Sequence, residues 1–304
     1  MLKTYRLDQS KVCEAPPETG SVWVYVNPDD AEKRQLVENC RLDEHTLNSA
    51  LDPDEQARLE FEPEHLALIL KRPKNYSAQD QFLFKTTSFG MFLFRDRLII
   101  VVAEDIPLFE GKQFSRVSSV NELCLKLIFR SIFHFIEHLK IINMVSESLE
   151  AKINASMENK YLLNLFTLEK SLVYYLNAIN SNSTVIDKLK VNAARIGLTQ
   201  EEQEYLEDII IENTQCYRQA EIYSNILASM MDARVSIVSN NLNVLMKTLN
   251  IITIGIMVPT FVVSAFSMNV RIPLSGLHHA FWIIMGLAVV SVIGFMVFWK
   301  RKKW

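Results

Sequence analysis

Polar and methionine side chains recur along the first of two uncharged stretches near the C-terminus. They are spaced three or four residues apart, so they share one face of a helix. They are Asn243, Met246, Asn250, Thr253 or Met257, Thr260 and Ser264. A polar stripe in an apolar helix needs either a partner helix or water. One stripe cannot enclose a water-filled pore, so that interpretation requires a symmetric oligomer. The alternative is that these groups only hold helices together.

The two uncharged stretches are long enough to cross a membrane. No Asp, Glu, Lys or Arg occurs in residues 248–270 or 272–299. A hydrocarbon core of about 30 Å needs about 20 helical residues. We therefore predict transmembrane helices at 249–269 and 281–299, joined by a loop at 270–280 and followed by a basic tail at 300–304. The second span is almost uniformly apolar, which is typical of a lipid-facing helix.

Basic residues flank the spans unevenly. Lys300 to Lys303 follow the second span and Lys247 precedes the first, whereas the loop between them has only Arg271. The positive-inside rule then places both termini in the cytoplasm and the loop outside. The N-terminus is polar and lacks the apolar segment of a signal peptide. We expect a multi-pass protein of the cell (inner) membrane.

The region before the spans divides by the type of secondary structure. Residues 1–117 are predicted to form a cytoplasmic α/β domain. Its β-rich runs are 21–26, 66–70, 81–86, 90–94 and 98–102, with a hairpin turn at 95–97 and a helix opening at Asp29.

Residues 118–248 are predicted to be a helical bundle that leads into a stalk. Helices are expected over about 120–155 and 157–196. Thr199 and Glu202 have the spacing of a capping box, which starts a third helix. As one helix, residues 199–268 would be about 105 Å long. Such a length indicates a stalk that enters the membrane and packs against copies of itself.

The rest of the chain gives no support for an enzyme or a nucleic-acid binder. The 304 residues carry a net charge of −3, without the basic surface typical of nucleic-acid binding. Cys13, Cys40, Cys124 and Cys216 form no metal-binding or disulfide pattern. His134, Glu137 and His138 match the HxxEH zinc-peptidase signature, but no third ligand is evident, so we interpret the match as chance. No nucleotide-binding motif or organic cofactor site is found, so nothing in the sequence indicates a coupling to ATP.

Three segments make the chain resemble the CorA family of magnesium transporters. Residues 243–250 read Asn-Val-Leu-Met-Lys-Thr-Leu-Asn, close to the family's N-x-x-M-K-x-L-T. Residues 259–260 are the Pro-Thr of its first span. Residues 266–269, Phe-Ser-Met-Asn, stand where the family has Tyr-Gly-Met-Asn. The order of an α/β domain, long helices, two spans and a basic tail matches as well.

The resemblance implies a homopentameric, funnel-shaped channel for divalent cations, magnesium above all and also cobalt or nickel. The first span would line the pore and the second would form an outer ring. Pore positions of the family carry over to Asn243, Met246, Leu249, Met257, Ser264 and Asn269. Met246, Leu249 and Met257 would form a hydrophobic gate. Ser267, Met268 and Asn269 would form the selectivity filter, where neutral oxygens bind the hydrated ion.

The resemblance also implies regulation by magnesium bound between subunits in the cytoplasmic part. Counting back from Asn243 places the stalk ligand at Asp208, and other acids lie close to it in the sequence. These are Glu204, Glu207 and Glu212. The ligand from the α/β domain would be Asp80 or Asp96, and the sequence does not choose between them.

One departure from the family leaves two alternatives open. Ser267 replaces the family's Gly, and the loop carries Arg271 but no acid. His278 and His279 at the mouth suit zinc better than magnesium. The first alternative is therefore a zinc transporter of the same fold. The second is a membrane-anchored pentameric scaffold or sensor that does not conduct.

Overall fold

The computed structural model describes residues 1–8, 10–17, 19–76, 81–155, 159–268 and 276–301. The chain divides into two compact units, Met1–Met231 and Asp232–Trp304. The first unit contains a seven-stranded sheet with the strand order β2-β1-β3-β7-β6-β5-β4. The strands are β1 (Leu2–Asp8), β2 (Lys11–Glu14), β3 (Val22–Val26), β4 (Arg58–Phe61), β5 (Leu66–Pro73), β6 (Thr86–Leu93) and β7 (Leu98–Val102).

Both faces of the sheet are covered, which explains why its central strands are almost continuously apolar. β3 and β7 pair in parallel, whereas β5, β6 and β7 pair antiparallel. Alternate residues of β5 enter different cores: Leu68 packs on the side of the long helices, and Ile69 on the side of the short ones. The short helices are α1 (Asp30–Cys40) and α2 (Glu44–Ser49).

The α2 side of the sheet is packed closely enough to require a glycine. A Cβ atom at Gly90 of β6 would lie 2.5 Å from the Cβ of Ala50, just after α2.

α1 itself begins with a capping box between Asp29 and Glu32, which satisfies backbone N–H groups of its first turn.

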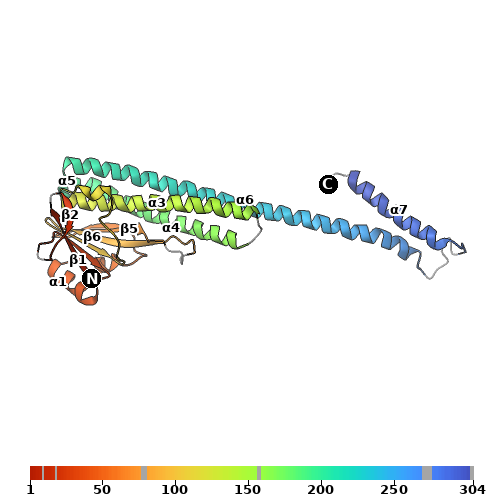
Figure 1. Ribbon diagram of the computed structural model, residues 1–304, viewed down its shortest axis with the longest axis horizontal. Coiled ribbons are helices and arrows are strands. Elements are labelled where there is room, and N and C mark those ends of the chain that lie inside the picture. The colour runs from red at the N-terminus through yellow and green to blue at the C-terminus, as the bar shows by residue number, and fades with distance from the viewer. Residues whose placement is uncertain (9, 18, 77–80, 156–158, 269–275, 302–304) are drawn as a thin grey trace. The chain divides into compact units, whose positions relative to one another are not determined.

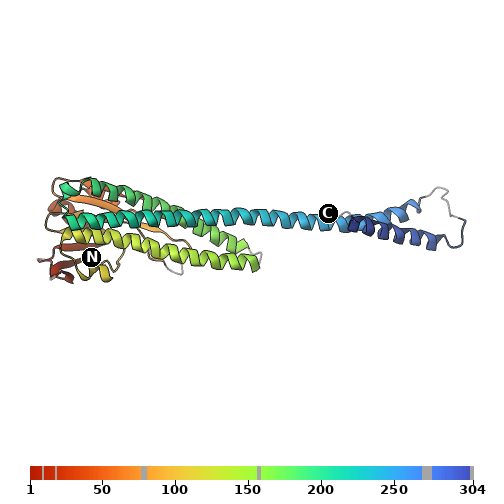
Figure 2. The ribbon, with the colours of Figure 1, turned by 90° about the horizontal axis from the view of Figure 1, so that it is seen from above.

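Long helices lie on the other side of the sheet. They are α3 (Val120–Ala155), α4 (Asn159–Val191) and the N-terminal part of α6 (Gln200–Ala265), with the short α5 (Ala193–Ile196) before α6. α3 and α4 contact the strands of the sheet. In both Figure 1 and Figure 2 the N-terminal part of α6 runs alongside α3 and α4. Its buried positions recur every three or four residues as far as Ala220, and again at Leu227 two turns later, as expected of a helix packed along one face. They are Glu202, Leu206, Ile209, Asn213, Cys216, Ala220 and Leu227.

Buried polar side chains join these helices to the sheet. The Asn182 amide of α4 accepts a hydrogen bond from Lys71 N and donates one to Lys71 O, both 2.8 Å long. Ser131 of α3 donates to the same carbonyl at 2.9 Å. The Lys71 backbone is therefore satisfied from two helices, which fixes where α3 and α4 cross β5.

The structure confirms most of the predicted elements. The predicted fold class, an α/β domain followed by a long helix and two apolar C-terminal helices, is observed. The helix predicted over 120–155 coincides with α3, and the unbroken third helix is α6. The capping box is formed, since Thr199 Oγ1 accepts from Glu202 N at 3.3 Å, and Glu202 Oε2 accepts from Thr199 N at 2.9 Å.

Other predicted boundaries were wrong. Residues 81–85 are not a strand, because Gln81 and Phe82 have φ angles of 45° and 69°, outside the extended region. The loop carries an apolar residue, Phe84, because this side chain packs in the core formed with the long helices. The Phe84 N–H donates to Ser171 Oγ of α4 at 3.0 Å. The run expected at 90–94 is the second half of β6. The helix expected over 157–196 breaks after Val191, and α5 follows.

Candidate functional site

The second unit holds the residues with the strongest functional signals. It contains the C-terminal part of α6 and all of α7 (Ala280–Arg301). α6 and α7 are both long and apolar enough to cross a membrane. α6 continues as a helix through Pro259, which lacks the N–H for a bond to the Gly255 carbonyl.

One face of α6 in this unit packs toward α7. A Cβ atom at Gly255 would lie 3.7 Å from Phe295 Cε1 of α7, so the two helices are in contact there. Half-buried residues extend this face at intervals of three or four. They are Ile251, Gly255, Val258, Val262 and Phe266. At about 100° per residue these five positions occupy about 80° of the helix circumference, and Pro259, which is half-buried as well, extends the face to about 100°.

The polar stripe lies on nearly the opposite face of α6. The predicted pore residues on the helix fall within about 120° of arc, and the centres of the two faces are about 170° apart. All are exposed in the single chain: Asn243, Met246, Leu249, Asn250, Thr253, Met257, Thr260 and Ser264. The gate residues expose 63% (Met246), 63% (Leu249) and 62% (Met257) of their surface. α7 thus covers the apolar face of α6 and leaves the polar stripe uncovered.

The side chains of the stripe offer oxygen atoms without charge. Thr253 Oγ1 donates to Leu249 O at 2.9 Å, and Thr260 Oγ1 donates to Ile256 O at 2.7 Å. Each hydroxyl proton is thereby satisfied within the helix, and its oxygen lone pairs remain available. Asn243 and Asn250 make no side-chain hydrogen bond to any residue that the structure describes. Such oxygens can accept hydrogen bonds from the water around a hydrated cation.

The predicted selectivity filter is described only in part. Ser267 Oγ donates to Ser264 O at 2.9 Å, and Ser267 N donates to the same carbonyl at 3.1 Å, which closes a turn after α6. Met268 is 59% exposed. Asn269 and Arg271 lie outside the described residues.

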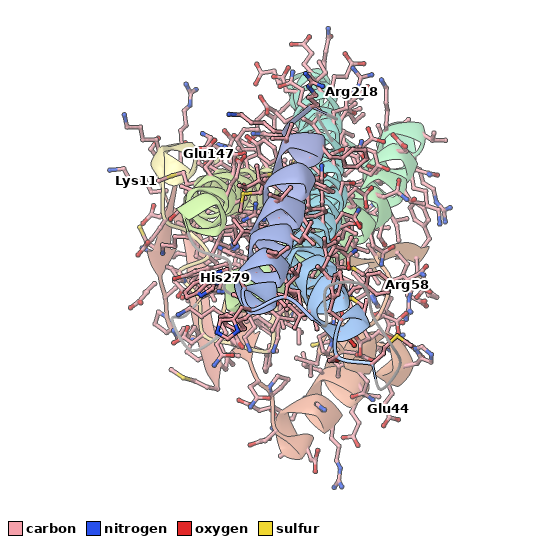
Figure 3. All side chains as sticks on the ribbon, turned by 90° about the vertical axis from the view of Figure 1, so that its right-hand side faces the viewer. Lys11, Glu44, Arg58, Glu147, Arg218 and His279 are labelled. Carbon is pink, nitrogen blue, oxygen red and sulfur yellow. The ribbon has the colours of Figure 1, made fainter. Side chains whose placement is uncertain are left out.

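The two histidines of the predicted outer loop are exposed and close to each other. The ring centroids of His278 and His279 are 6.1 Å apart. His279 lies where α7 begins (Figure 3), and its carbonyl accepts hydrogen bonds from Trp282 and Ile283. No cluster of three His, Cys, Asp or Glu side chains that could hold a metal occurs in the described part of the chain.

The predicted regulatory acids differ in their partners. Asp208 is exposed, and no basic side chain among the described residues pairs with it. Glu207 forms an ion pair with Lys190 at 3.2 Å, and Glu204 accepts a hydrogen bond from Gln200 at 3.3 Å. Glu212 is half-buried. Of the two partners considered for Asp208, Asp96 pairs with Arg97 at 3.5 Å, and Asp80 lies outside the described residues.

The HxxEH residues are arranged as packing groups and do not resemble a zinc site. His134 and His138 contact each other through their Nε2 atoms at 3.1 Å, and His138 Nδ1 bonds to the Tyr175 hydroxyl at 2.6 Å. Glu137 pairs with Arg130 at 3.3 Å. Burial lowers the pKa of His134 to about 3 and that of His138 to about 4, with nearby Arg72 adding to both shifts.

Two features of the structure were not predicted from the sequence. The face of α6 that packs on α7 has its own signal, because Gly255 and the apolar residues around it repeat with the same period as the polar stripe. The second feature is a cavity beside Arg72 of β5. Its signal is the pair Lys71 and Arg72, two cations in a strand whose residues are all buried.

Comparison with known proteins identifies the family. The family model for CorA-like Mg2+ transporter proteins matches residues 18–302. The chain belongs to the CorA family. It is therefore one of a family of ion transporters, and its HxxEH match does not indicate an enzyme.

Similar proteins cover nearly the whole chain. The cobalt/magnesium transport protein CorA of Methanocaldococcus jannaschii is 25% identical over 302 residues, 93% of this chain and 91% of that protein. The complete structure of the CorA magnesium transporter from that organism matches with a TM-score of 0.86 at 22% identity, covering 99% of this chain and 98% of that one. The ZntB cytoplasmic domain from Vibrio parahaemolyticus has the same fold, with a TM-score of 0.62 at 13% identity, covering 78% and 98%.

Proposed function

We propose that this protein is a passive channel for divalent cations, with magnesium as its main ion and cobalt or nickel as further ions. The observation that carries the proposal is the placement of the polar stripe on the face of α6 turned away from α7. A polar face that its own chain leaves uncovered needs water or a partner in the membrane. Membership of the CorA family supports water and ions.

Several copies of the chain must together form the ion pathway, because one polar stripe cannot surround an ion. We propose a homopentamer in which α6 of each chain faces the central axis and α7 faces lipid. The exposed apolar side chains of the gate, Met246, Leu249 and Met257, would meet their copies around the axis. A narrow ring of such side chains excludes ions by dewetting.

The outer end of the pathway would select the ion. We assign this role to Ser267, Met268 and Asn269, with a ring of Asn269 carboxamide oxygens at the mouth. Mg2+ holds its water tightly, so neutral oxygens that bind the hydrated ion avoid the cost of dehydration. The oxygens of Asn243, Asn250, Thr260 and Ser264 would continue this lining along α6.

We place both termini in the cytoplasm, on the inner side of the cell membrane, with residues 270–280 outside. The basic residues after α7 support this orientation. An inside-negative potential then contributes about 2.3 kcal/mol per charge per 100 mV to entry, and about twice that for a divalent cation. No other energy source is needed for uptake. Magnesium bound at Asp208 between subunits would close the channel once the internal concentration is high.

The experiment is cation uptake into liposomes that hold the purified protein, with magnesium and zinc offered separately. We expect magnesium flux in the wild type and a strong loss of it in Asn269→Ala, with the oligomer intact by size-exclusion chromatography. Asn192→Ala, in the first unit, is the matched control and should conduct like the wild type. Unchanged magnesium flux in Asn269→Ala would overturn the assignment of the filter.

The zinc alternative has one observation in its favour, the adjacent exposed rings of His278 and His279 beside the start of α7. Zinc flux without magnesium flux, lost on replacement of both histidines by Asn, would establish it. A well-formed oligomer that passes neither ion would favour a scaffold or sensor that does not conduct.

A further inference from the structure

A cavity in the first unit is lined by cations and has no metal-binding character. It has a volume of about 130 Å³ and lies between β5, β6, α3 and the segment that follows β7. Its polar lining consists of Arg72, Asn75, Arg130, Ser131, His134 and one acid, Glu137. A water molecule needs only about 10–15 Å³ by this measure, so the cavity has room for a polyatomic ion with some of its water.

Arg72 is the most unusual residue of this lining. It is only 8% exposed. None of the described residues accepts a hydrogen bond from its guanidinium group or forms an ion pair with it. The acid that acts on its pKa, Glu104, is already paired with Lys74 at 2.8 Å. Burial lowers the pKa of Arg72 to about 10, so the group stays charged at neutral pH. A buried charge without a partner is costly, and proteins normally supply one.

The other charged groups of the lining are Arg130 and Glu137, which leave the cavity with a net positive charge together with Arg72. Arg130 pairs with the half-exposed Glu137 at 3.3 Å, which neutralises one of the two guanidinium groups in part. His134 adds no negative charge. Because its Nε2 contacts His138 Nε2, and His138 Nδ1 bonds to Tyr175, the three side chains form a connected line toward the core. This leaves His134 Nδ1 as the nitrogen that can donate to a ligand when the ring is in that tautomer.

The remaining wall of the cavity is apolar. Phe89, Leu108 and Leu127 are among the residues that form it. This wall excludes water from one side of the cations, and an anion held there interacts with them at a lower effective dielectric than in bulk water. Asn75 is exposed, so the cavity is open to solvent on that side.

We propose that this cavity is a binding site for an oxyanion of the phosphate class, held by Arg72 and Arg130 with Asn75 and His134 as further donors. Guanidinium groups bind tetrahedral oxyanions through two parallel N–H bonds, and the carboxamide adds a neutral donor. The anion supplies the counter-charge that Arg72 lacks within the described residues. It is either free inorganic phosphate or the phosphoryl group of a larger metabolite whose remaining part projects past Asn75.

The test is isothermal titration calorimetry on the full-length protein in detergent, in the presence of EDTA so that magnesium does not complex the ligand. Inorganic phosphate and adenosine monophosphate are titrated separately, with potassium chloride at matched ionic strength. The variants are Arg72→Gln, Arg72→Lys and Arg130→Gln. Arg116→Gln is the matched control, since Arg116 is exposed and does not line the cavity.

We expect one saturable site per chain for phosphate or the monophosphate, and no saturable heat from chloride. Arg72→Gln and Arg130→Gln should each weaken binding about tenfold or more, because each removes hydrogen bonds to a charged ligand. Arg116→Gln should bind like the wild type. If Arg72→Gln does not fold, Arg72→Lys and Arg130→Gln carry the same comparison, with Arg72→Lys weakened because Lys cannot form the bidentate contact.

The two ligands separate the two sources of the anion. Equal affinity for phosphate and monophosphate indicates a site for the free ion, and at least tenfold tighter binding of the monophosphate indicates a phosphorylated metabolite. Absence of saturable binding of both to the wild type would overturn the proposal. So would binding that Arg72→Lys and Arg130→Gln leave unchanged. Neither outcome depends on cation transport.

Discussion

At the scale of single residues, the acids on α6 are distinguished by whether a cation already holds them. Glu207 is paired with Lys190 at 3.2 Å, whereas Asp208 is exposed and unpaired among the described residues. An unpaired carboxylate that points to solvent is free to share a cation with another copy of the chain. The spacing of acids along the sequence could not separate these neighbours, because the pairing depends on Lys190 of α4.

We predict that Asp208→Asn weakens the closure of the channel by internal magnesium. The substitution removes a charged ligand and keeps the size of the side chain, so inhibition should require several-fold more magnesium. The measurement is magnesium flux into liposomes preloaded with increasing magnesium. Glu207→Gln is the matched control and should be inhibited by magnesium like the wild type. Its exposed ion pair with Lys190 contributes only about 0–1 kcal/mol to stability, so its loss should leave the structure unchanged. Equal inhibition in both variants would show that the regulatory ligand is elsewhere.

At the scale of elements, the interior of the sheet was easier to predict than its edges. β3, β5 and β7 are dense in Val, Ile and Leu because both faces are buried, and their positions were predicted. β1, β2 and β4 were missed because they lie toward the two edges of the sheet and are rich in charged residues, so they lack the dense apolar run of the central strands. Residues 81–85 were mistaken for a strand because apolar content alone does not separate a strand from a loop that packs on helices.

The contact of α4 with β5 could not be predicted from the sequence, because it depends on hydrogen bonds between residues far apart in the chain. Asn182 forms two hydrogen bonds with the Lys71 backbone in a buried position. We predict that Asn182→Ala lowers the free energy of unfolding by about 1–3 kcal/mol, since the Lys71 N–H is left buried without a partner.

Chemical denaturation of the full-length protein, followed by circular dichroism, measures this effect. Asn192→Ala removes a comparable bond, from Asn192 Nδ2 to Lys188 O at 2.8 Å, but at the surface. Water replaces the lost partner there, so this control should cost no more than about 0.5 kcal/mol. Equal costs for the two variants would contradict the importance that we give to burial.

At the scale of the whole molecule, one helix serves two environments. The buried positions of α6 recur regularly down to Leu227, where α3 and α4 provide its partners. In the second unit the same helix presents large apolar side chains to the outside, including Leu245 and Leu249, at 64% and 63% exposure. These side chains are largely exposed in the single chain, which is the physical reason to expect an assembly in a membrane.

The sequence predicted this change of environment well but not the orientation of α6. The uncharged stretches and the polar stripe follow from residue types alone. The face that contacts α7 depends on the Gly255–Phe295 approach, which joins two segments 40 residues apart. Because this contact shows which face of α6 packs on α7, it also shows that the polar stripe lies on the face away from α7.

If the polar stripe lines the path of the ion, a charged, water-soluble thiol reagent should block magnesium flux when a cysteine is placed on it. Thr260→Cys lies on the stripe, and Val262→Cys lies on the face toward α7; both are compared with the wild type, whose own cysteines lie in the first unit. We predict rapid loss of flux in Thr260→Cys and none in Val262→Cys or the wild type. Loss of flux in Val262→Cys with Thr260→Cys unaffected would contradict this prediction.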